Sequence, residues 1–481
     1  MQTEHDLVVL GAGPAGLTAA ISSLDLGKST LVLEASKEFG GISKTVQIDG
    51  WRFDLGGHRF FTKVGRVEEF WKRILKPEDF LKRPRLSRIF YREKFFDYPL
   101  KPFNALFGLG PIETAKCITS FIWAKVRPPK DQSHFEGWVT ARFGKRLYEI
   151  FFKTYTEKVW GISTTQLSSA WAAQRIKNLS LTSAILNAFG ISGKSKIVTL
   201  IDSFDYPRLG PGMMWEKCAQ IVSENDLGAV RTEEFPVKIL KHEDRFVVET
   251  NKNSYLTSKV ISTIPLSELP KVLGCDDSAI LAAAQDLKYR DFLTVGLIIE
   301  GEEIFPDNWI YIHSPDVKVG RIQNFRSWSP DLVKPGFTFL GLEYFVNVGD
   351  EYWEAKDEDL VALGIRELSK LGIVDENRII TGYVVRVPKA YPVYDETYAQ
   401  SVKLIGDWLQ SEWSGVFPVG RNGMHRYNNQ DHSMLTAMLA VENAFNGTDH
   451  DLWAVNVDEE YHEAGNSNEN LGGRAAPIFK K

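Results

Sequence analysis

The segment YTEKVWGISTTQLSSAWAAQRI concentrates side chains that could hold a ligand, but it offers no obvious nucleophile. It contains Tyr155, Glu157, Trp160, Trp171 and Arg175. It carries no cluster of metal ligands, no Ser/His/Asp grouping and no phosphate loop. Aromatic rings often line concave ligand sites, and arginine pairs with carboxylates or phosphates through two hydrogen bonds. The chemistry of such a site therefore depends on what the rest of the chain brings to it, such as a cofactor.

A glycine-rich turn near the N-terminus predicts where a cofactor binds. The text HDLVVLGAGPAGLTAAI indicates a buried strand, a tight turn and a helix. Its G-x-G-x-x-G motif lets the backbone approach a pyrophosphate, which would lie at the helix N-terminus where free N–H groups attract anions. The motif residues are Gly11, Gly13, Pro14, Ala15 and Gly16. Glu34 closes the next predicted strand, where its carboxylate could accept hydrogen bonds from a ribose.

Two further stretches favour FAD over NAD. In EASKEFGGISKT, Glu34 and Ala35 are followed by the pair Gly40-Gly41, and this pattern resembles the extended fingerprint of glutathione-reductase-type FAD flavoproteins, the amine-oxidase branch in particular. The stretch VGRNGMHRYNNQDHSM resembles the C-terminal flavin signature of that branch. The cofactor residues implied there are Gly420, Arg421, Asn429 and Ser433. A helix over 433–445 would point at the flavin and stabilise negative charge on its reduced form.

The predicted elements place these motifs in an α/β fold with a discontinuous, Rossmann-like FAD-binding domain. Long helical patterns and then alternating strand patterns interrupt this domain, so we expect inserted helical and antiparallel-sheet substrate domains. The FAD-binding domain is expected at residues 1–65, 225–275 and 415–450, a mainly helical domain at 66–224, a sheet-rich domain at 276–414 and a C-terminal tail at 451–481. The inserts would form the other half of a cleft.

Seven blocks along the chain resemble those of UDP-galactopyranose mutases, and they occur in the same order. They are LGGHRFFTK (55–63), YTEKVWG (155–161), AAQRI (172–176), YPRLG (206–210), KVGRIQNF (318–325), AYP (390–392) and GRNGMHRY (420–427). YTEKVWG is the most specific block, because the broader amine oxidases lack it. The resemblance implies a pyranose-to-furanose isomerisation without net redox change, in which reduced FAD is the nucleophile and NAD(P)H serves as external reductant.

The same resemblance implies roles for individual residues. Gly57 and His58 would lie beside the flavin. The implied catalytic residues are His58, Arg321, Trp160, Tyr155, Arg421 and Tyr427, and the implied substrate-binding residues are Arg175, Tyr206, Tyr391 and Arg59. Core packing is the alternative role for Trp160, a turn position before Pro207 is the alternative for Tyr206, and a surface charge is the alternative for Arg175. Lys153 and Lys158 are expected on a solvated face.

Two positions depart from the mutase pattern. Leu179 stands where the mutases carry an arginine that helps to hold the diphosphate, and Asn429 stands where bacterial mutases carry a carboxylate. Arg59 or Arg208 could supply the missing positive charge. These departures predict a substrate other than UDP-galactose, such as another nucleotide-linked sugar or a lipid-linked one.

Two other hypotheses remain open at the level of sequence. An FAD-dependent oxidoreductase of the amine-oxidase or protoporphyrinogen-oxidase type would take a hydride from a C–N or C–C bond and pass electrons to oxygen or another acceptor. A flavin-free binding module like the GDP-dissociation inhibitors would share the fold. The intact glycine-rich motif, Glu34 and the pair Gly420-Arg421 disfavour this second hypothesis.

The composition is that of an ordinary globular protein with a small-molecule substrate. The 481 residues carry a net charge of -5, so no basic footprint for nucleic acid is present, and two or three domains are expected. Three distant cysteines predict neither a disulfide framework nor a zinc site, and we expect no metal. The early first strand and the lack of a long apolar run predict a cytoplasmic protein without a transmembrane segment. Residues 95–110 are expected to cover the mouth of the cleft or to touch lipid.

Overall fold

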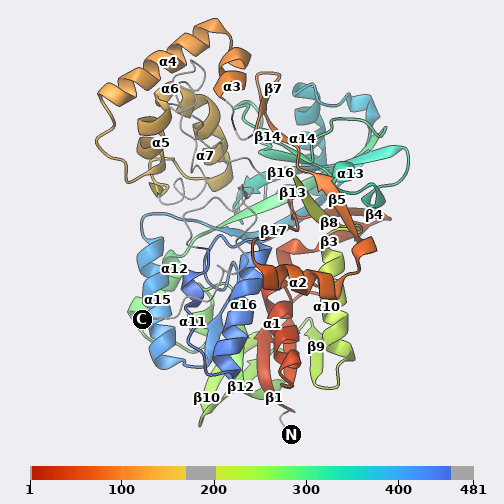
Figure 1. Cartoon of the computed structure of the whole chain (residues 1–481), viewed down its shortest axis with the longest axis vertical. Helices are drawn as coiled ribbons and strands as arrows, with labels where there is room; N and C mark the ends of the chain where they lie inside the picture. The colour runs from red at the N-terminus through yellow and green to blue at the C-terminus, as the bar shows by residue number, and fades with distance from the viewer. Residues whose placement is uncertain (1–2, 99, 101, 170–201, 457–481) are drawn as a thin grey trace.

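The structure is a computed structural model that describes residues 3–98, 100, 102–169 and 202–456. Two sheets lie one above the other along the long axis of the molecule, and a group of helices projects beside the upper sheet (Figure 1). No helix in these described ranges is both long enough and apolar enough to cross a membrane.

The lower sheet has seven strands, most of them parallel. Its order is β10 (Pro236–His242), β11 (Arg245–Thr250), β12 (Ser254–Ser262), β1 (Thr3–Leu10), β2 (Thr30–Glu34) and β9 (Gly228–Thr232), and β18 (Val416–Pro418) pairs with β12. β1 lies between β12 and β2 in parallel register. Its apolar run Leu7–Leu10 is fully buried, as expected for a parallel strand that is covered on both faces.

Helices cover both faces of this sheet. One face packs against α1 (Pro14–Asp25), α2 (Gly65–Ile74), α10 (Gly212–Glu224) and α16 (Gln430–Phe445). The other packs against α11 (Leu269–Val272), α12 (Ser278–Asp286) and α15 (Tyr398–Glu412). α16 comes from the far end of the described chain, yet it lies against α1 (Figure 1). The predicted α/β class with a discontinuous dinucleotide domain is therefore confirmed.

The upper sheet also has seven strands and is mainly antiparallel. Its order is β17 (Ile379–Pro392), β13 (Tyr289–Glu300), β16 (Phe337–Val346), β15 (Arg321–Asn324), β14 (Trp309–Ile312), β6 (Ser87–Tyr91) and β7 (Lys94–Asp97), with only β14 and β6 parallel. One face packs on α14 (Asp357–Lys370). The other face is aromatic and belongs to the core cluster that includes the helical group. α13 (Phe325–Trp328) follows β15 directly.

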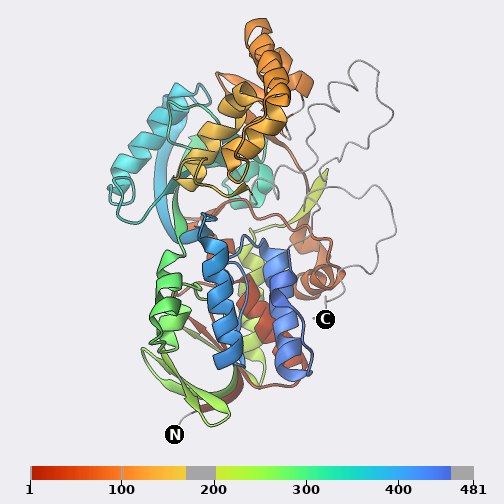
Figure 2. The same cartoon turned by 90° about the vertical axis from the view of Figure 1, so that its left-hand side faces the viewer.

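The helical group packs on the aromatic face of the upper sheet and lies at the upper end of the molecule when it is turned (Figure 2). It contains α3 (Pro102–Leu109), α4 (Pro111–Val126), α5 (Phe135–Phe143), α6 (Lys145–Tyr148), a π-helical turn (Glu149–Lys153) and α7 (Thr154–Trp160). Two small sheets, β3 (Thr45–Ile48) with β4 (Trp51–Asp54) and β5 (Phe80–Pro84) with β8 (Ser203–Pro207), connect the larger parts.

Elements of the predicted helical range 66–224 are shared among all three parts of the molecule. α2 and α10 pack beside α1 in the dinucleotide half. β6 and β7 extend the upper sheet. The helical group itself occupies only part of this range, because hairpins and helices within it complete the cores of the neighbouring parts.

Candidate active site

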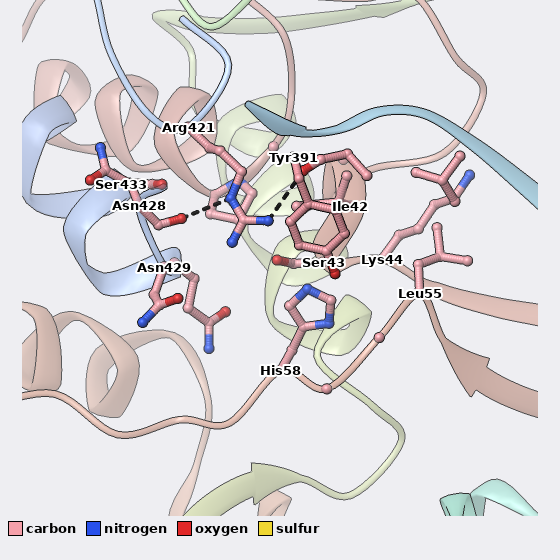
Figure 3. A pocket seen from close by; sticks show the side chains of 18 of the residues that line it. Ile42, Ser43, Lys44, Leu55, His58, Tyr391, Arg421, Asn428, Asn429 and Ser433 are labelled. Carbon is pink, nitrogen blue, oxygen red and sulfur yellow. Dashed lines mark hydrogen bonds between the residues drawn. The ribbon is translucent and has the colours of Figure 1, made fainter. Parts of the chain in front are cut away.

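One cavity of about 470 Å³ runs from the glycine-rich turn to the aromatic face of the upper sheet (Figure 3). Most predicted cofactor and substrate residues line it: Gly11, Gly13, Pro14, Ala15, Glu34, Gly41, Gly57, His58, Arg59, Arg321, Tyr391, Gly420, Arg421, Tyr427, Asn429 and Ser433. These residues come from both sheets and from segments at opposite ends of the sequence. The size lies in the range of pockets that enclose most of a small-molecule ligand.

The nucleotide end of the cavity has the shape that a dinucleotide requires. Gly11 has a φ of +102°, and a side-chain carbon on Gly16 would lie 1.9 Å from the carbonyl oxygen of Gly11. Gly13 faces open space, since a carbon added there would come no closer than 3.9 Å to the backbone of Gly41. The backbone of this turn can thus approach a pyrophosphate at the N-terminus of α1, as the fit of FAD demands.

Glu34 stabilises this turn as well as lining the cavity. Its Oε2 accepts a hydrogen bond from the Ala12 N–H at 2.7 Å, and its Oε1 accepts from both the N–H and the hydroxyl of Ser36 at 2.8 Å. The remaining lone pairs of the carboxylate face the cavity, where a ribose could donate to them. Ala35, which was also predicted to contact the cofactor, is exposed and lies outside the lining.

A second helix N-terminus points at the same cavity. α16 begins after Asn429, and both Asn429 and Ser433 line the cavity. Gly420 has a φ of +81°, and a carbon added there would lie 3.0 Å from Cβ of Ala15, so β18 and α1 approach closely only because this residue is glycine. Two helix N-termini therefore place positive potential where FAD would carry its phosphates and the electron-rich edge of its ring.

Arg421 is held rigidly at the flavin end. Its Nε donates to the Asn428 carbonyl at 2.9 Å and its Nη1 donates to the Ala390 carbonyl at 3.3 Å (Figure 3). The guanidinium lies 4.8 Å from the ring centre of Tyr427 and 5.5 Å from that of Tyr391. The two rings are stacked, with centres 5.7 Å apart. Their faces stabilise the cation without neutralising it.

His58 is a neutral imidazole in this setting. Burial, together with the charges of Arg421 and Arg321, lowers the pKa of His58 to about 3. A carbon added at Gly56, whose φ is +97°, would lie 3.8 Å from Nη2 of Arg321 and 4.0 Å from Cε1 of His58. The added carbon would fit at these distances, so it is the positive φ that favours glycine at this position.

Arg321 belongs to a buried polar network on the upper sheet. It forms an ion pair with Glu343, which is fully buried, and Nη2 of Arg321 lies 3.4 Å from the Tyr391 hydroxyl. Gln323 donates to the other oxygen of Glu343 at 2.8 Å and accepts from Nε1 of Trp328 at 3.1 Å. Burial alone would lower the pKa of Arg321, but the Glu343 carboxylate, together with Tyr391 and Tyr155, raises that pKa well above its usual value.

Sequence reasoning missed Glu343 and several lining residues. Arg321 and Glu343 are register partners in neighbouring strands, so β15 and β16 fix the ion pair. A lone carboxylate inside the otherwise apolar strand TFLGLEYF is a signal that could have revealed it. The other unpredicted lining residues at this end include Tyr98, Trp309, Tyr311, Gln323 and Asn428.

Arg59 lies at the far end of the cavity, beside an aromatic wall. Its guanidinium is 5.2 Å from the ring centre of Trp309. The guanidinium of Arg85 lies 5.5 Å from the same ring and 5.6 Å from that of Tyr98. Tyr98 packs against Tyr311 with ring centres 4.7 Å apart. This end therefore combines cations with flat apolar surfaces, a combination suited to a ring-containing anionic ligand.

Tyr155 and Trp160 of the YTEKVWG block stand behind the lining instead of in it, which corrects their predicted place in the cleft. Tyr155 stacks on His313 at 4.9 Å and meets the edge of Tyr311, a lining residue, at 5.4 Å. Trp160 is 2% exposed and lies 6.3 Å from the ring of Tyr427. α7 packs against the upper sheet, so its aromatic residues support the wall from outside.

Three other predicted positions also need correction. Tyr206 is fully buried in β8 and donates its hydroxyl to Asp54, so it is a core residue. Arg208 forms an exposed ion pair with Asp331 at 2.7 Å and does not line the cavity. Lys158 is not on a solvated face, since its Nζ donates to the carbonyls of Ser314 and Val319 at 2.7 and 3.2 Å. Arg175 and Leu179 lie outside the described residues.

Several solved structures share this fold. A reduced UDP-galactopyranose mutase superposes with a TM-score of 0.81 at 20% identity, covering 96% of this chain and 100% of the other. A putrescine oxidase variant gives 0.63 at 14% identity, covering 92% and 99%. A fatty acid isomerase from P. acnes that produces CLA gives 0.60 at 14% identity, covering 92% and 99%. At such identities the likeness concerns the fold alone.

Curated relatives match over short segments. An inactive all-trans-retinol 13,14-reductase of Danio rerio is 45% identical over 64 residues, 13% of this chain and 10% of its own length. An L-amino-acid oxidase of Crotalus adamanteus is 33% identical over 109 residues, 20% of this chain and 21% of its own. A putrescine oxidase of Kocuria rosea is 44% identical over 54 residues, 11% of each. The chain thus spans about a fifth or less of these relatives.

A family model decides the assignment, because it covers most of the chain. The model for flavin containing amine oxidoreductases matches residues 14–429, a range that reaches from the first turn of α1 to the residue before α16. This range includes nearly every residue that lines the cavity, and the glycine-rich cradle, the two helix N-termini and Arg421 fit the cofactor of that family. The chain belongs to the flavin containing amine oxidoreductase family, and its cofactor is FAD.

Proposed function

We propose that this FAD-dependent enzyme isomerises an activated sugar, nucleotide-linked or lipid-linked, between pyranose and furanose forms without net redox change. The observation that carries the proposal is that Arg59, Arg321 and Arg421 line one cavity together with the aromatic rings of Trp309, Tyr391 and Tyr427. The cations suit a diphosphate, and the aromatic rings suit a sugar or base ring. The full-length structural likeness to a UDP-galactopyranose mutase supports the same proposal at the level of the fold.

The arginines are positioned before any substrate arrives. Glu343 holds Arg321, and backbone carbonyls hold Arg421. Donors fixed in this way need no reorganisation when a diphosphate leaves and returns, so their full effect is available in the transition state. Loss of one such contact is expected to cost about 3 kcal/mol.

The side chains at this end are poor proton carriers near neutral pH. The pKa of His58 is lowered to about 3, chiefly by burial, and burial raises the pKa of Tyr391 to about 12. Each therefore keeps one protonation state over the physiological range. Bound FAD would supply the nucleophile in its reduced form. The protein residues would orient the anomeric carbon, hold the diphosphate and exclude water.

The test is an isomerisation assay on the purified, flavin-loaded protein. Oxidised and dithionite-reduced samples would be incubated with a panel of nucleotide hexoses and polyprenyl-diphosphate sugars, and products would be separated by chromatography and weighed by mass spectrometry. We expect an isomer of unchanged mass in the reduced sample alone. Absence of any isomer in both samples across the panel would overturn the proposal.

A matched pair of variants links the activity to the cavity. Arg59→Gln removes a lining cation and is expected to lower kcat/KM about 100-fold. Arg208→Gln removes the surface arginine paired with Asp331 and should leave kcat/KM unchanged. Equal losses in both variants would contradict the assignment of the diphosphate to Arg59.

A second candidate is an oxidoreductase that removes a hydride from a C–N or C–C bond. The buried ion pair between Arg321 and Glu343 favours it, because this carboxylate already compensates one of the three cations. Membership in the amine oxidoreductase family points the same way. Its signature is bleaching of the oxidised flavin by a panel of amines or amino acids, with oxygen consumption during turnover.

A further inference from the structure

α4 presents an apolar stripe to solvent. Among the described residues, the three most exposed large apolar side chains all lie on this helix: Ile112, Val126 and Trp123, at 72%, 70% and 61%. Ile122 is 55% exposed and Ile118 is 40% exposed. Separations of ten residues (Ile112 to Ile122), four (Ile122 to Val126) and three (Trp123 to Val126) place these side chains along one face of the helix. Monomeric proteins seldom expose such a contiguous patch without a binding role.

The stripe is additional to the face that packs into the protein. Cys117, Phe121 and Ala124 form the buried side of α4 and belong on the opposite face. A surface helix normally presents polar residues on the face that is exposed to solvent. The packing of the helical group therefore does not account for the outer residues, and α4 is apolar on two faces. At 16 residues, α4 is also too short to span a bilayer.

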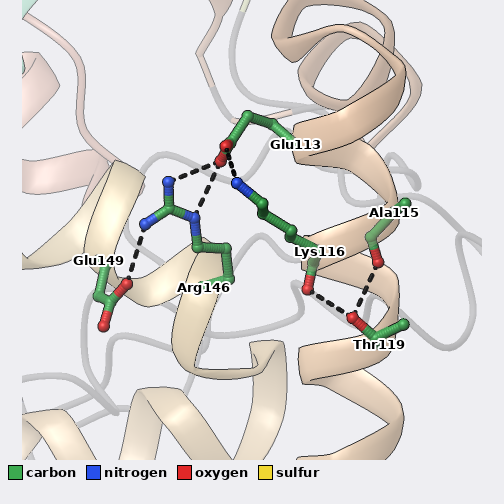
Figure 4. A network of polar contacts seen from close by, with 6 residues as sticks. All are labelled: Glu113, Ala115, Lys116, Thr119, Arg146 and Glu149. Carbon is green, nitrogen blue, oxygen red and sulfur yellow. Dashed lines mark hydrogen bonds and ion pairs between the residues drawn. The ribbon is translucent and has the colours of Figure 1, made fainter.

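Basic side chains flank the exposed stripe. Lys116, Arg127 and Lys130 are exposed on or just after α4. The guanidinium of Arg127 lies 5.5 Å from the ring of Trp123. The acidic Glu113 is turned toward α6, where Arg146 and Lys116 neutralise it (Figure 4). The rim of the stripe therefore carries a positive charge.

The charge of the surrounding region has the same sign. Residues 80–153 contain 15 Lys and Arg but only 6 Asp and Glu, a net charge of +9. Since the whole chain carries -5, the remaining residues carry -14. The excess of positive charge is thus concentrated in the sequence range that contains α4, although Arg88 of this range is paired with Asp307. This range would be drawn toward an anionic surface while the rest is repelled from it.

We propose that α4 docks this protein onto an anionic lipid bilayer. The stripe Ile112, Ile122, Trp123 and Val126 would enter the boundary between headgroups and acyl chains, where tryptophan is favoured. Arg127 and Lys130 would contact lipid phosphates. A second copy of this chain fits the face less well, because a symmetric contact would bring two regions of like charge together. The proposal concerns a surface apart from the cavity and does not depend on the reaction.

Vesicle flotation with the intact flavoprotein tests the proposal. We expect flotation with vesicles of phosphatidylcholine and phosphatidylglycerol, weak flotation with phosphatidylcholine alone, and loss of binding at high salt. The triple variant Ile122→Gln, Trp123→Gln and Val126→Gln keeps good helix formers and should weaken partitioning at least about tenfold. The double variant Arg127→Gln and Lys130→Gln should reduce binding and its salt dependence.

The matched control replaces two equally exposed apolar residues elsewhere. Val348 and Ile380 are each 58% exposed, and Val348→Gln with Ile380→Gln should leave partitioning unchanged. Retained flavin absorbance and melting temperature would show that the α4 variants are folded. Failure of the native protein to float, or equal flotation of native and triple-variant protein, would overturn the proposal. So would a native dimer that the triple variant converts to monomer, since α4 would then bind a second copy.

Discussion

Asp54 is a fully buried carboxyl group between two hydroxyl groups. Thr45 donates to its Oδ1 at 2.9 Å, and Tyr206 donates to its Oδ2 at 2.5 Å. Burial raises the pKa of Asp54 to about 7, although the two hydrogen bonds oppose the rise. In the unfolded chain this pKa is about 3.9. The folded protein therefore retains a proton that the unfolded chain has released. The stabilising contribution of the Asp54 proton is fully present below about pH 4 and is lost as the pH rises through 7.

Asp54→Asn should remove this pH dependence. An amide is neutral at every pH, and it can accept from Thr45 and donate to the oxygen of Tyr206, as a protonated Asp54 can. Between pH 5 and pH 8, we expect the melting temperature of the native protein to fall by more than that of the variant. Parallel pH profiles of the two melting temperatures would contradict the assignment.

Glu343 offers a second prediction at the scale of one residue. Glu343→Gln keeps the shape but leaves the Arg321 charge uncompensated beside His58 and the flavin position. Extra positive charge favours the electron-rich reduced flavin, so the midpoint potential should rise, on the order of 30 mV for about 1.4 kcal/mol. Spectroelectrochemical titration measures this potential. Glu302→Gln, which removes the surface partner of Arg326, is the control and should not shift it.

At the scale of elements, α7 is fastened to the upper sheet through Lys158. The Lys158 ammonium caps the connection between β14 and β15 by donating to backbone carbonyls, and burial lowers its pKa to about 8. Lys153, one turn earlier, is exposed. The two lysines look alike in the sequence, but the Lys158 ammonium donates hydrogen bonds to backbone carbonyls that water does not reach, whereas Lys153 is exposed to solvent.

Lys158→Met should therefore destabilise the protein by about 2 kcal/mol, because it removes charged hydrogen bonds and leaves buried carbonyls unsatisfied. Lys153→Met should change the free energy of unfolding by less than about 0.5 kcal/mol. Urea denaturation followed by far-UV circular dichroism compares the two variants. Similar midpoints would show that the Lys158 contacts contribute nothing net.

Elements that depend on local chemistry were predictable, and contacts between distant segments were not. The turn at Gly11 follows from glycine's access to positive φ, so the strand, turn and helix could be predicted from a dozen residues. The burial of Tyr206 depends on Asp54, 152 residues away, and that of Lys158 depends on Ser314, 156 residues away. Sequence patterns carry no record of such partners, so the predicted pocket contained the buried residues Tyr206 and Trp160.

At the scale of the whole molecule, the cavity joins both sheets, so bound FAD should stabilise the protein as a unit. A ligand at 100 times its Kd adds about 2.7 kcal/mol to the free energy of unfolding. We expect removal of FAD to lower the melting temperature of the lower sheet and of the aromatic face above it together. Differential scanning calorimetry of the holo and apo forms measures this. A shift in only one of two separate transitions would show that the halves unfold independently.

The position of β18 and α16 has a consequence for the time at which the protein becomes active during its synthesis. When Gly11 and Glu34 of a nascent chain have left the ribosome, the opposite wall of the cavity is still missing. It is complete only after Ser433 has also left the ribosome. Until then Val260–Ser262 of β12 lack their pairing partner β18, and an unpaired strand edge promotes aggregation. Flavin uptake must therefore follow the synthesis of the segment that contains Ser433, and a shortage of flavin should lower the yield of folded protein as well as its activity.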